Sequence, residues 1–111
     1  MVISIDLGAA HVAGNSILEL DAAEIDRITA GVLTVGSNGA GPISVSSAIS
    51  PASTSTLHLI SGDDVADTIT GSVSVTNLAI EAGNSVLFVN SATNVVTNLA
   101  IDAGLLAVFI E

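Results

Sequence analysis

The 111-residue sequence contains no cysteine, tryptophan or tyrosine, and its only aromatic residues are Phe88 and Phe109. Without cysteine the chain forms neither a disulfide nor a thiolate metal site. With no Trp or Tyr ring, it lacks the usual stacking platform for sugars or nucleic-acid bases. An interior built from this composition has to be filled mainly by Val, Ile, Leu and Ala.

Positive charge is almost absent as well, because one cation, Arg27, stands against eleven acidic residues and the formal net charge is −10. Nucleic acids and anionic membrane surfaces are bound through Lys and Arg, so this composition argues against both as partners. No run of about 18 apolar residues occurs, which argues against membrane insertion. The opening "MVISIDLGAA" has no basic n-region, so no signal peptide is visible.

Short runs of alternating apolar and polar residues fill most of the chain, each bounded by Gly, Asn or Ser. Such period-two runs are typical of β-strands, and the chain is predicted to be all-β. In "LDAAEIDRI" (Leu20–Ile28), Asp21 and Glu24 have capping-box spacing, which leaves a single helical turn or a loop open. The predicted strands lie in Ser16–Leu20, Val32–Val35, Ile43–Ser46, Thr56–Ile60, Ser72–Val75 and Ser85–Val89.

A repeat of 21 residues relates "TNLAIEAG" (Thr76–Gly83) to "TNLAIDAG" (Thr97–Gly104), and eight of the fifteen pairs from Thr76/Thr97 onward are identical. A weaker copy, "STLHLISG" (Ser55–Gly62), lies another 21 residues earlier. Within the repeat the alternation changes parity, which predicts a bend at Thr76–Asn77. A unit that bends and returns after about 20 residues is one coil of a β-solenoid, which buries its inner face by stacking on the next coil.

We therefore expect residues 1–111 to form a single β-helical repeat segment: a right-handed parallel β-helix of about five coils, roughly 25 Å tall at a rung spacing of about 4.8 Å. A β-sandwich explains the strands but not the fixed spacing. In the β-helix, Asn77 and Asn98 are predicted to form an amide ladder, and Phe88 to lie over Phe109. Three evenly spaced glycines, Gly62, Gly83 and Gly104, are predicted to form turns that need a free backbone.

The densest polar cluster is "SGDDVADT" (Ser61–Thr68), which holds Asp63, Asp64 and Asp67. Asp67 takes the repeat position of Phe88, so the segment is expected to bulge out of the coil. Its "GDD" resembles one short motif of β-helical polygalacturonases, and paired carboxyls suit sugar hydrolysis. Their other motifs and any cluster of basic residues for a polyuronate are absent, so a solvated loop is favoured over a catalytic site. Calcium binding by this loop stays open, although solvated acids are favoured over a calcium site both here and at Glu81 and Asp102.

The remaining polar candidates carry little chemistry. His11 and His58 stand alone, with His58 facing outward, and metal ligation would need partners that the sequence does not offer. Arg27 is predicted to pair with Glu24 or Asp26. No Gly-x-Ser-x-Gly motif or phosphate loop occurs. A third hypothesis, an ice-binding solenoid, needs regular Thr-x-Thr rows, and Thr68–Thr70 is the triplet that suggests one.

One resemblance to a known family covers about four fifths of the chain. The segment "LELDAAEIDRITAGVLTVGSNGAGPISVSSAIS" (Leu18–Ser50) resembles repeats of filamentous haemagglutinin-type exoproteins. In those repeats an Asp-Ala-Ala-Glu-Leu-Asp-Arg-Ile stretch precedes Thr-Ala-Gly-x-Leu-x-Ile-Gly and an Ile-x-Val strand. "NVVTNLAIDAG" (Asn94–Gly104) is similar to the Asn-x-Val-x-x-Leu-Ala element of the same repeats. The family's N-terminal secretion domain, with its Asn-Pro-Asn motifs, is not found here.

The resemblance implies a structural or adhesive shaft segment, part of a longer fibrous β-helix that is secreted or exposed on a bacterial surface. It implies export by two-partner secretion through an outer-membrane transporter, and ligands on host or neighbouring cells. The family shaft offers no catalytic residues and no cofactor. The alternative is a truncated polysaccharide-active enzyme using Asp63, Asp64 and Asp67. Open rungs at both ends predict end-to-end self-association of the isolated chain.

Overall fold

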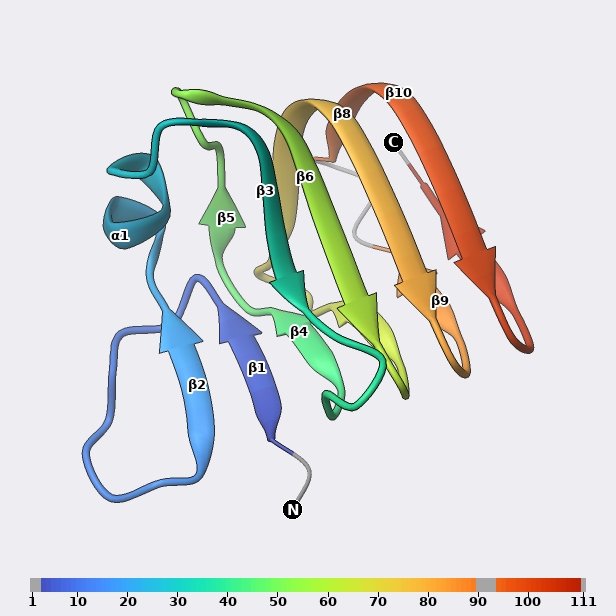
Figure 1. The fold of residues 1–111 in the computed structure, drawn as a ribbon, viewed down its shortest axis with the longest axis horizontal. Helices are drawn as coiled ribbons and strands as arrows, with labels where there is room; N and C mark the ends of the chain where they lie inside the picture. The colour runs from blue at the N-terminus through green and yellow to red at the C-terminus, as the bar shows by residue number, and fades with distance from the viewer. Residues whose placement is uncertain (1–2, 90–93, 111) are drawn as a thin grey trace.

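The structure is a computed structural model that describes residues 3–89 and 94–110, wound into a parallel β-solenoid of about four turns spaced about 21 residues apart. In Figure 1 the strands of the near face run downward, the chain returns behind them, and each coil lies further to the right, which is a right-handed winding. The predicted fold is confirmed. The elements are β1 (Ser4–Leu7), β2 (Ile17–Leu20), α1 (Ala22–Asp26), β3 (Ala30–Gly36), β4 (Ile43–Val45), β5 (Ala48–Ile49), β6 (Thr54–Ser61), β7 (Val65–Asp67), β8 (Ser72–Ala82), β9 (Val86–Phe88), β10 (Val95–Ala103) and β11 (Ala107–Phe109).

Two parallel sheets form the main walls of the solenoid. Sheet A has the strand order β2-β1-β4-β7-β9-β11, and sheet B has the order β3-β6-β8-β10. The short strand β5 pairs with the first residues of β8 and begins a third wall. In the last coils the register is the repeat itself, because Thr56 pairs with Asn77 and Asn77 with Asn98.

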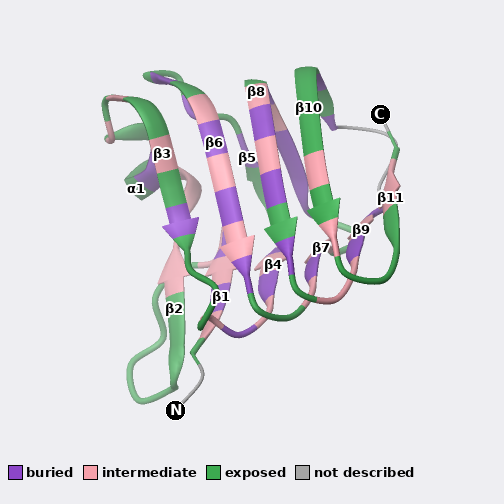
Figure 2. Cartoon of the chain, turned by 45° about the vertical axis from the view of Figure 1, so that its right-hand side comes forward, coloured by how far each residue is buried: buried purple, intermediate pink, exposed green. Residues whose placement is uncertain are grey.

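Each long strand of the later coils bends rather than ending at the corner. The sequence predicts a corner at Thr76–Asn77, and β8 runs through it without a break. Val73 before the corner and Leu78 after it are both buried, although an unbent strand would turn one of them to solvent. The parity change therefore marked a bend inside one strand. Figure 2 shows the resulting alternation of buried and half-buried residues along β6 and β8.

The interior consists of stacked aliphatic columns. Leu57 lies under Leu78, and Leu59 under Ile80, and all four are at most 1% exposed. Phe88 is the largest fully buried side chain. Because each coil contributes one residue to each column, the inner face of a coil is covered only by its neighbours.

The N-terminal 30 residues depart from the repeat, which is why the solenoid has about four turns and not the five predicted. Strand β1, which the sequence analysis missed, lies between β2 and β4 in sheet A, with Ile5 and Leu7 buried. The Asp6 carboxylate accepts a hydrogen bond from Ser46 Oγ at 2.5 Å and so ties this strand to the following coil. Sheet A thus extends two strands beyond the point where sheet B ends.

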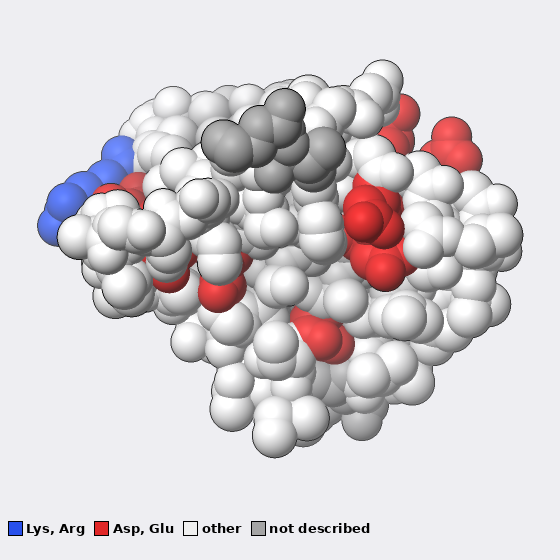
Figure 3. Space-filling view, turned by 90° about the horizontal axis from the view of Figure 1, so that it is seen from below, with Lys and Arg blue, Asp and Glu red and all other residues white. Residues whose placement is uncertain are grey.

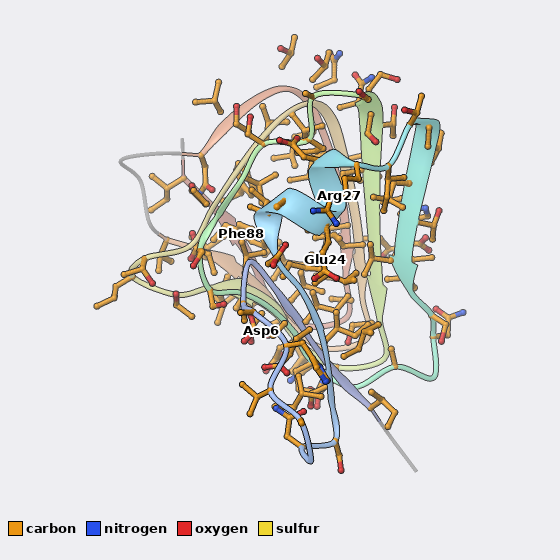
Figure 4. All side chains as sticks on the ribbon, turned by 90° about the vertical axis from the view of Figure 1, so that its left-hand side faces the viewer. Asp6, Glu24, Arg27 and Phe88 are labelled. Carbon is orange, nitrogen blue, oxygen red and sulfur yellow. The ribbon has the colours of Figure 1, made fainter. Side chains whose placement is uncertain are left out.

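Helix α1 covers the end of the core that these extra strands leave open. The capping box is complete, because Asp21 Oδ1 accepts from the Glu24 amide and Glu24 Oε1 accepts from the Asp21 amide. Of the two readings left open by the sequence, the helical turn is therefore correct. Ile25 points inward and is 2% exposed. Figure 4 looks along the solenoid from this end, and α1 lies across the opening with Glu24 and Arg27 labelled on it.

Candidate functional site

A polar ladder follows the corner of three successive coils. Asn98 Nδ2 donates to Asn77 Oδ1 at 2.8 Å, and Asn77 Nδ2 donates to Thr56 Oγ1 at 3.2 Å. The three residues are register partners on β10, β8 and β6, so stacking at about 4.8 Å brings one side chain directly over the next. The structure thus brings the two predicted asparagines together. It also adds Thr56, which the weaker third copy of the repeat could have indicated.

The two phenylalanines stack inside the solenoid. Their ring centroids are 5.2 Å apart and their planes make an angle of 27°. Phe88 is fully buried, whereas Phe109 in the last coil is half-buried. A centroid distance in this range is typical of favourable aromatic pairs, so the repeat position holds β9 and β11 together from within.

Gly62, Gly83 and Gly104 lie one above another at the turn between sheets B and A. The expectation that they need a free backbone is only half right, since none of the three has a positive φ. What excludes a side chain is space: a Cβ on Gly83 would lie 2.3 Å from the carbonyl oxygen of Gly62, and one on Gly104 would lie 2.1 Å from that of Gly83. Close stacking of turns, rather than a left-handed conformation, requires glycine there.

The acidic segment does not bulge as expected. Val65 is fully buried in β7, which pairs with β4 and β9 as an ordinary rung. Asp67 occupies the position of Phe88 half-buried, because Oδ1 accepts from the Val89 amide at 3.0 Å and Oδ2 from Asn94 Nδ2 at 3.2 Å. Hydrogen bonding to the next coil offsets the cost of placing a carboxylate on this path.

The other two carboxylates of this segment lie at the turn. Asp64 Oδ1 accepts from the Ser85 amide in the next coil at 2.9 Å, while Asp63 is exposed. Two of the three candidate carboxylates are thus engaged with backbone or side-chain donors of the neighbouring coil. Within residues 3–89 and 94–110, no three His, Cys, Asp or Glu side chains gather where they could hold a metal ion.

Neither histidine stands alone, which corrects the sequence analysis. His58 Nε2 lies 2.6 Å from Glu81 Oε2, and His11 Nδ1 lies 3.7 Å from Glu19 Oε1. Glu81 is 23 positions after His58, which is one coil plus two residues. That offset places Glu81 on the outer face of the strand next to His58. The pairing could therefore have been predicted from the repeat. Asp102 follows Glu81 in the register on β10.

Arg27 does not form the predicted ion pair. Of the described carboxylates, none lies within 4.0 Å of its guanidinium group. Glu24 is engaged in the capping box, and Asp26 Oδ1 accepts from the Ala52 amide at 2.9 Å. Figure 3 shows the basic side chain at one end of the molecule, apart from most of the acidic ones in that view.

The triplet Thr68–Thr70 offers no flat threonine row. Thr68 and Thr70 lie outside the strands, and both hydroxyls donate to the carbonyl oxygen of Ser46. Ile69 between them is 93% exposed. The triplet forms a turn, so it gives the ice-binding hypothesis no support.

An open groove of about 540 Å³ crosses all four coils on the outside of the corner, and the sequence analysis missed it. Its lining is uncharged and rich in hydroxyl groups because outward positions repeat every 21 residues, as in Ser55, Thr76 and Thr97. These hydroxyl residues, spaced 21 positions apart in the sequence, could have indicated the groove. The groove is lined by Ala30, Pro51, Ala52, Ser53, Thr54, Ser55, Ser74, Val75, Thr76, Val95 and Thr97.

No helix in the described ranges is long and apolar enough to cross a membrane. Comparison with known proteins identifies no relative: no protein-family model, no curated protein and no solved structure matches this chain. The resemblance to filamentous haemagglutinin-type repeats therefore remains a prediction from the residues. The structure itself shows a parallel β-solenoid.

Proposed function

We propose that the chain is a structural and adhesive shaft segment of a secreted or surface-exposed bacterial exoprotein, and that it performs no catalysis. The observation that carries this proposal is the in-register stacking of like residues. Asn77 bonds to Asn98, Phe88 stacks on Phe109, and the turn glycines lie one on another. The polar groups that the repeat places at the same position are used to join one coil to the next, as a fibre requires.

The surface supports an adhesive role that is spread over a face. The groove across the four coils has repeated hydroxyls, namely those of Ser55, Thr76 and Thr97, and no charged lining residue. An extended ligand on a host or neighbouring cell could follow it along the solenoid axis, with hydroxyls as donors and acceptors. Export through an outer-membrane transporter belongs to the same proposal and rests on the sequence resemblance.

The enzymatic alternative has less support. Asp64 and Asp67 accept hydrogen bonds from donors of the following coil, which leaves Asp63 as the exposed carboxylate of the three. Glycoside hydrolysis requires two carboxyl groups facing a sugar and, for inversion, a water. Replacing all three with Asn should abolish any polysaccharide-cleaving activity if this alternative holds. Absence of activity on every polyuronate tested would exclude it.

An antibody raised against the chain gives the first test of the shaft proposal. Cytosol, surface extract and medium of the source organism are blotted, and size and location are read together. We expect a band of hundreds of kilodaltons at the surface or in the medium. A band of 10.9 kDa confined to the cytosol would contradict the proposal.

Adhesion through the groove is tested with beads coated with the purified chain. The double variant Thr76→Asp/Thr97→Asp places two charges in the groove, and Ala79→Asp/Ala100→Asp places two on the outer face of sheet B. We expect the first variant alone to lose binding to sister cells and to host epithelial cells. Equal binding by both variants would exclude the groove, and binding by the wild-type chain no better than by an albumin control would exclude adhesion.

A further inference from the structure

Asn38 is the only one of the seven asparagines of the chain that is followed by glycine. An asparagine side chain loses ammonia when the backbone nitrogen of the next residue attacks its Cγ atom. A Cβ on that next residue hinders the attack and restricts the backbone, and glycine has none. The pair Asn38–Gly39 is therefore the place in the sequence where this reaction meets the least hindrance.

The pair lies at the centre of the turn between β3 and β4. The Ala40 amide donates to the Ser37 carbonyl at 3.0 Å, which closes a four-residue β-turn with Asn38 and Gly39 in the middle. Ser37, Asn38 and Gly39 are all exposed. Its two chain neighbours aside, a Cβ built on Gly39 would have no heavy atom nearer than Ser37 Oγ at 3.9 Å. Water therefore reaches the reacting atoms freely.

The stacking of the coils turns the Asn38 side chain away from the solenoid. Asn38 takes the position of the turn glycines, because β3 and β6 pair Gly36 with Ile60 two residues earlier. A Cβ on Gly62 would lie 2.4 Å from the Asn38 carbonyl oxygen, so a side chain in this column points toward the preceding coil. Strand β3 is the first of sheet B, and no described strand lies before it in that sheet (Figure 1). The Asn38 side chain thus lies in solvent, and no described residue holds it by a hydrogen bond.

The corresponding turn two coils later offers a matched comparison. Asn84 is half-buried and is followed by Ser85, whose amide donates to Asp64 Oδ1 at 2.9 Å. The residue after Asn84 therefore has a Cβ, and its nitrogen is held by a carboxylate. The Gly39 amide has only a long bond of 3.3 Å to Ser37 Oγ. The other described asparagines donate their side-chain amides to neighbours; they are Asn15, Asn77, Asn94 and Asn98.

We propose that Asn38 is a site of spontaneous modification, at which water deamidates the folded chain. The Gly39 nitrogen forms a bond to Asn38 Cγ while the bond from Cγ to Nδ2 breaks. The proton of the Gly39 nitrogen passes through solvent to Nδ2, which leaves as ammonia. The inference does not depend on whether the chain serves as a shaft.

Water then opens the succinimide ring that this step forms. Hydrolysis of the new bond between Cγ and the Gly39 nitrogen gives aspartate at position 38 with an ordinary main chain. Hydrolysis of the original peptide bond gives isoaspartate, in which the main chain passes through Cβ and Cγ. In either case one water is consumed and an amide has become a carboxylate.

The two products affect the solenoid differently. Both add one negative charge to a chain that already carries −10. Isoaspartate also lengthens the main chain inside a turn on which the next coil rests, since the Gly62 amide donates to the Ala40 carbonyl at 3.0 Å. We therefore expect isoaspartate to lower the melting temperature. Aspartate, which is a usual turn residue, should leave it nearly unchanged.

The test is incubation of the folded 111-residue chain in heavy-oxygen water for several weeks, at neutral and at mildly alkaline pH. Mass spectrometry of proteolytic fragments detects the exchange of nitrogen for labelled oxygen, and electron-transfer fragmentation separates aspartate from isoaspartate. We expect Asn38 to convert before any other described asparagine. Conversion should be faster at alkaline pH, because the attacking nitrogen has to lose its proton.

Two variants make the test specific. Gly39→Ala should slow the conversion about fivefold or more, because alanine is less free in its backbone and hinders the attack. Its fold should be unchanged, since the added Cβ has space. Asn38→Asp gives the charge without the altered linkage, and its melting temperature is compared with that of the isoaspartate fraction separated by anion exchange.

Three results would overturn the proposal. The first is an Asn38 that stays intact in the folded chain while the chain in guanidinium chloride converts, because the turn would then protect it. The second is conversion of Asn84 ahead of Asn38. The third is an equal rate for the wild-type chain and Gly39→Ala.

Discussion

Asn77 has its two side-chain partners in two different coils, which makes it the most connected member of the polar ladder. Asn77→Ala removes the bonds to Thr56 and to Asn98, whereas Asn98→Ala removes only the second. At about 0.5–1.5 kcal/mol per hydrogen bond, we expect Asn77→Ala to lower the free energy of unfolding about twice as much as Asn98→Ala. Urea unfolding measures both, and equal losses would show that the bond to Thr56 contributes nothing.

The stacked glycines give a second prediction at this scale. A Cβ on Gly83 would meet a backbone oxygen at 2.3 Å, and a backbone cannot move aside as a flexible side chain can. We expect Gly83→Ala to cost at least about 3 kcal/mol, beyond the usual effect of overpacking. Gly31→Ala is the matched control, because nothing lies within 4 Å of its added Cβ. Thermal unfolding of both variants checks this, and similar melting temperatures would contradict it.

Among the elements, α1 is short enough that its cap determines whether it forms. Asp21→Ala removes the acceptor for the Glu24 amide and should cost about 1 kcal/mol, the usual effect of losing an N-cap. Because Ile25 covers the end of the core, we also expect hydrogen exchange to speed up in β3. Arg27→Ala should change the free energy of unfolding by less than about 0.5 kcal/mol, as surface substitutions do. A larger loss would indicate that Arg27 has a partner after all.

The strands show how far sequence reasoning reached and where it stopped. Where the 21-residue copies are most alike, in β8 and β10, the corner and the stacking partners could be predicted, because residues 21 positions apart lie side by side. In β7 the same register led to the wrong expectation of a bulge. In the first 30 residues no repeat relates one position to another. Strand β1 lies between β2 and β4 for reasons of packing that alternation alone does not encode.

The polar sites divide in the same way. Asn77 with Asn98 follows from the period, and His58 with Glu81 would have followed from the period plus two. The hydrogen bonds of Asp67 could not be read from the sequence, since a carboxylate at an inward position looks unfavourable until its donors in the next coil are known. The groove was missed because its depth depends on how several adjacent strands bend together, which the sequence of one strand does not show.

For the whole molecule, the position of β1 between two strands means that the two ends resist a pulling force differently. Strand β1 is bonded to a neighbour on each side, whereas β10 and β11 are each bonded on one side only. Under tension applied through the two ends, the chain should come apart from its C-terminal coil first, one coil at a time. Each release of about 21 residues would lengthen the chain by about 70 Å at 3.3–3.6 Å per residue. Such a rod is expected to lengthen in equal steps as successive coils unfold from the C-terminal coil. The end that contains β1 is expected to unfold last.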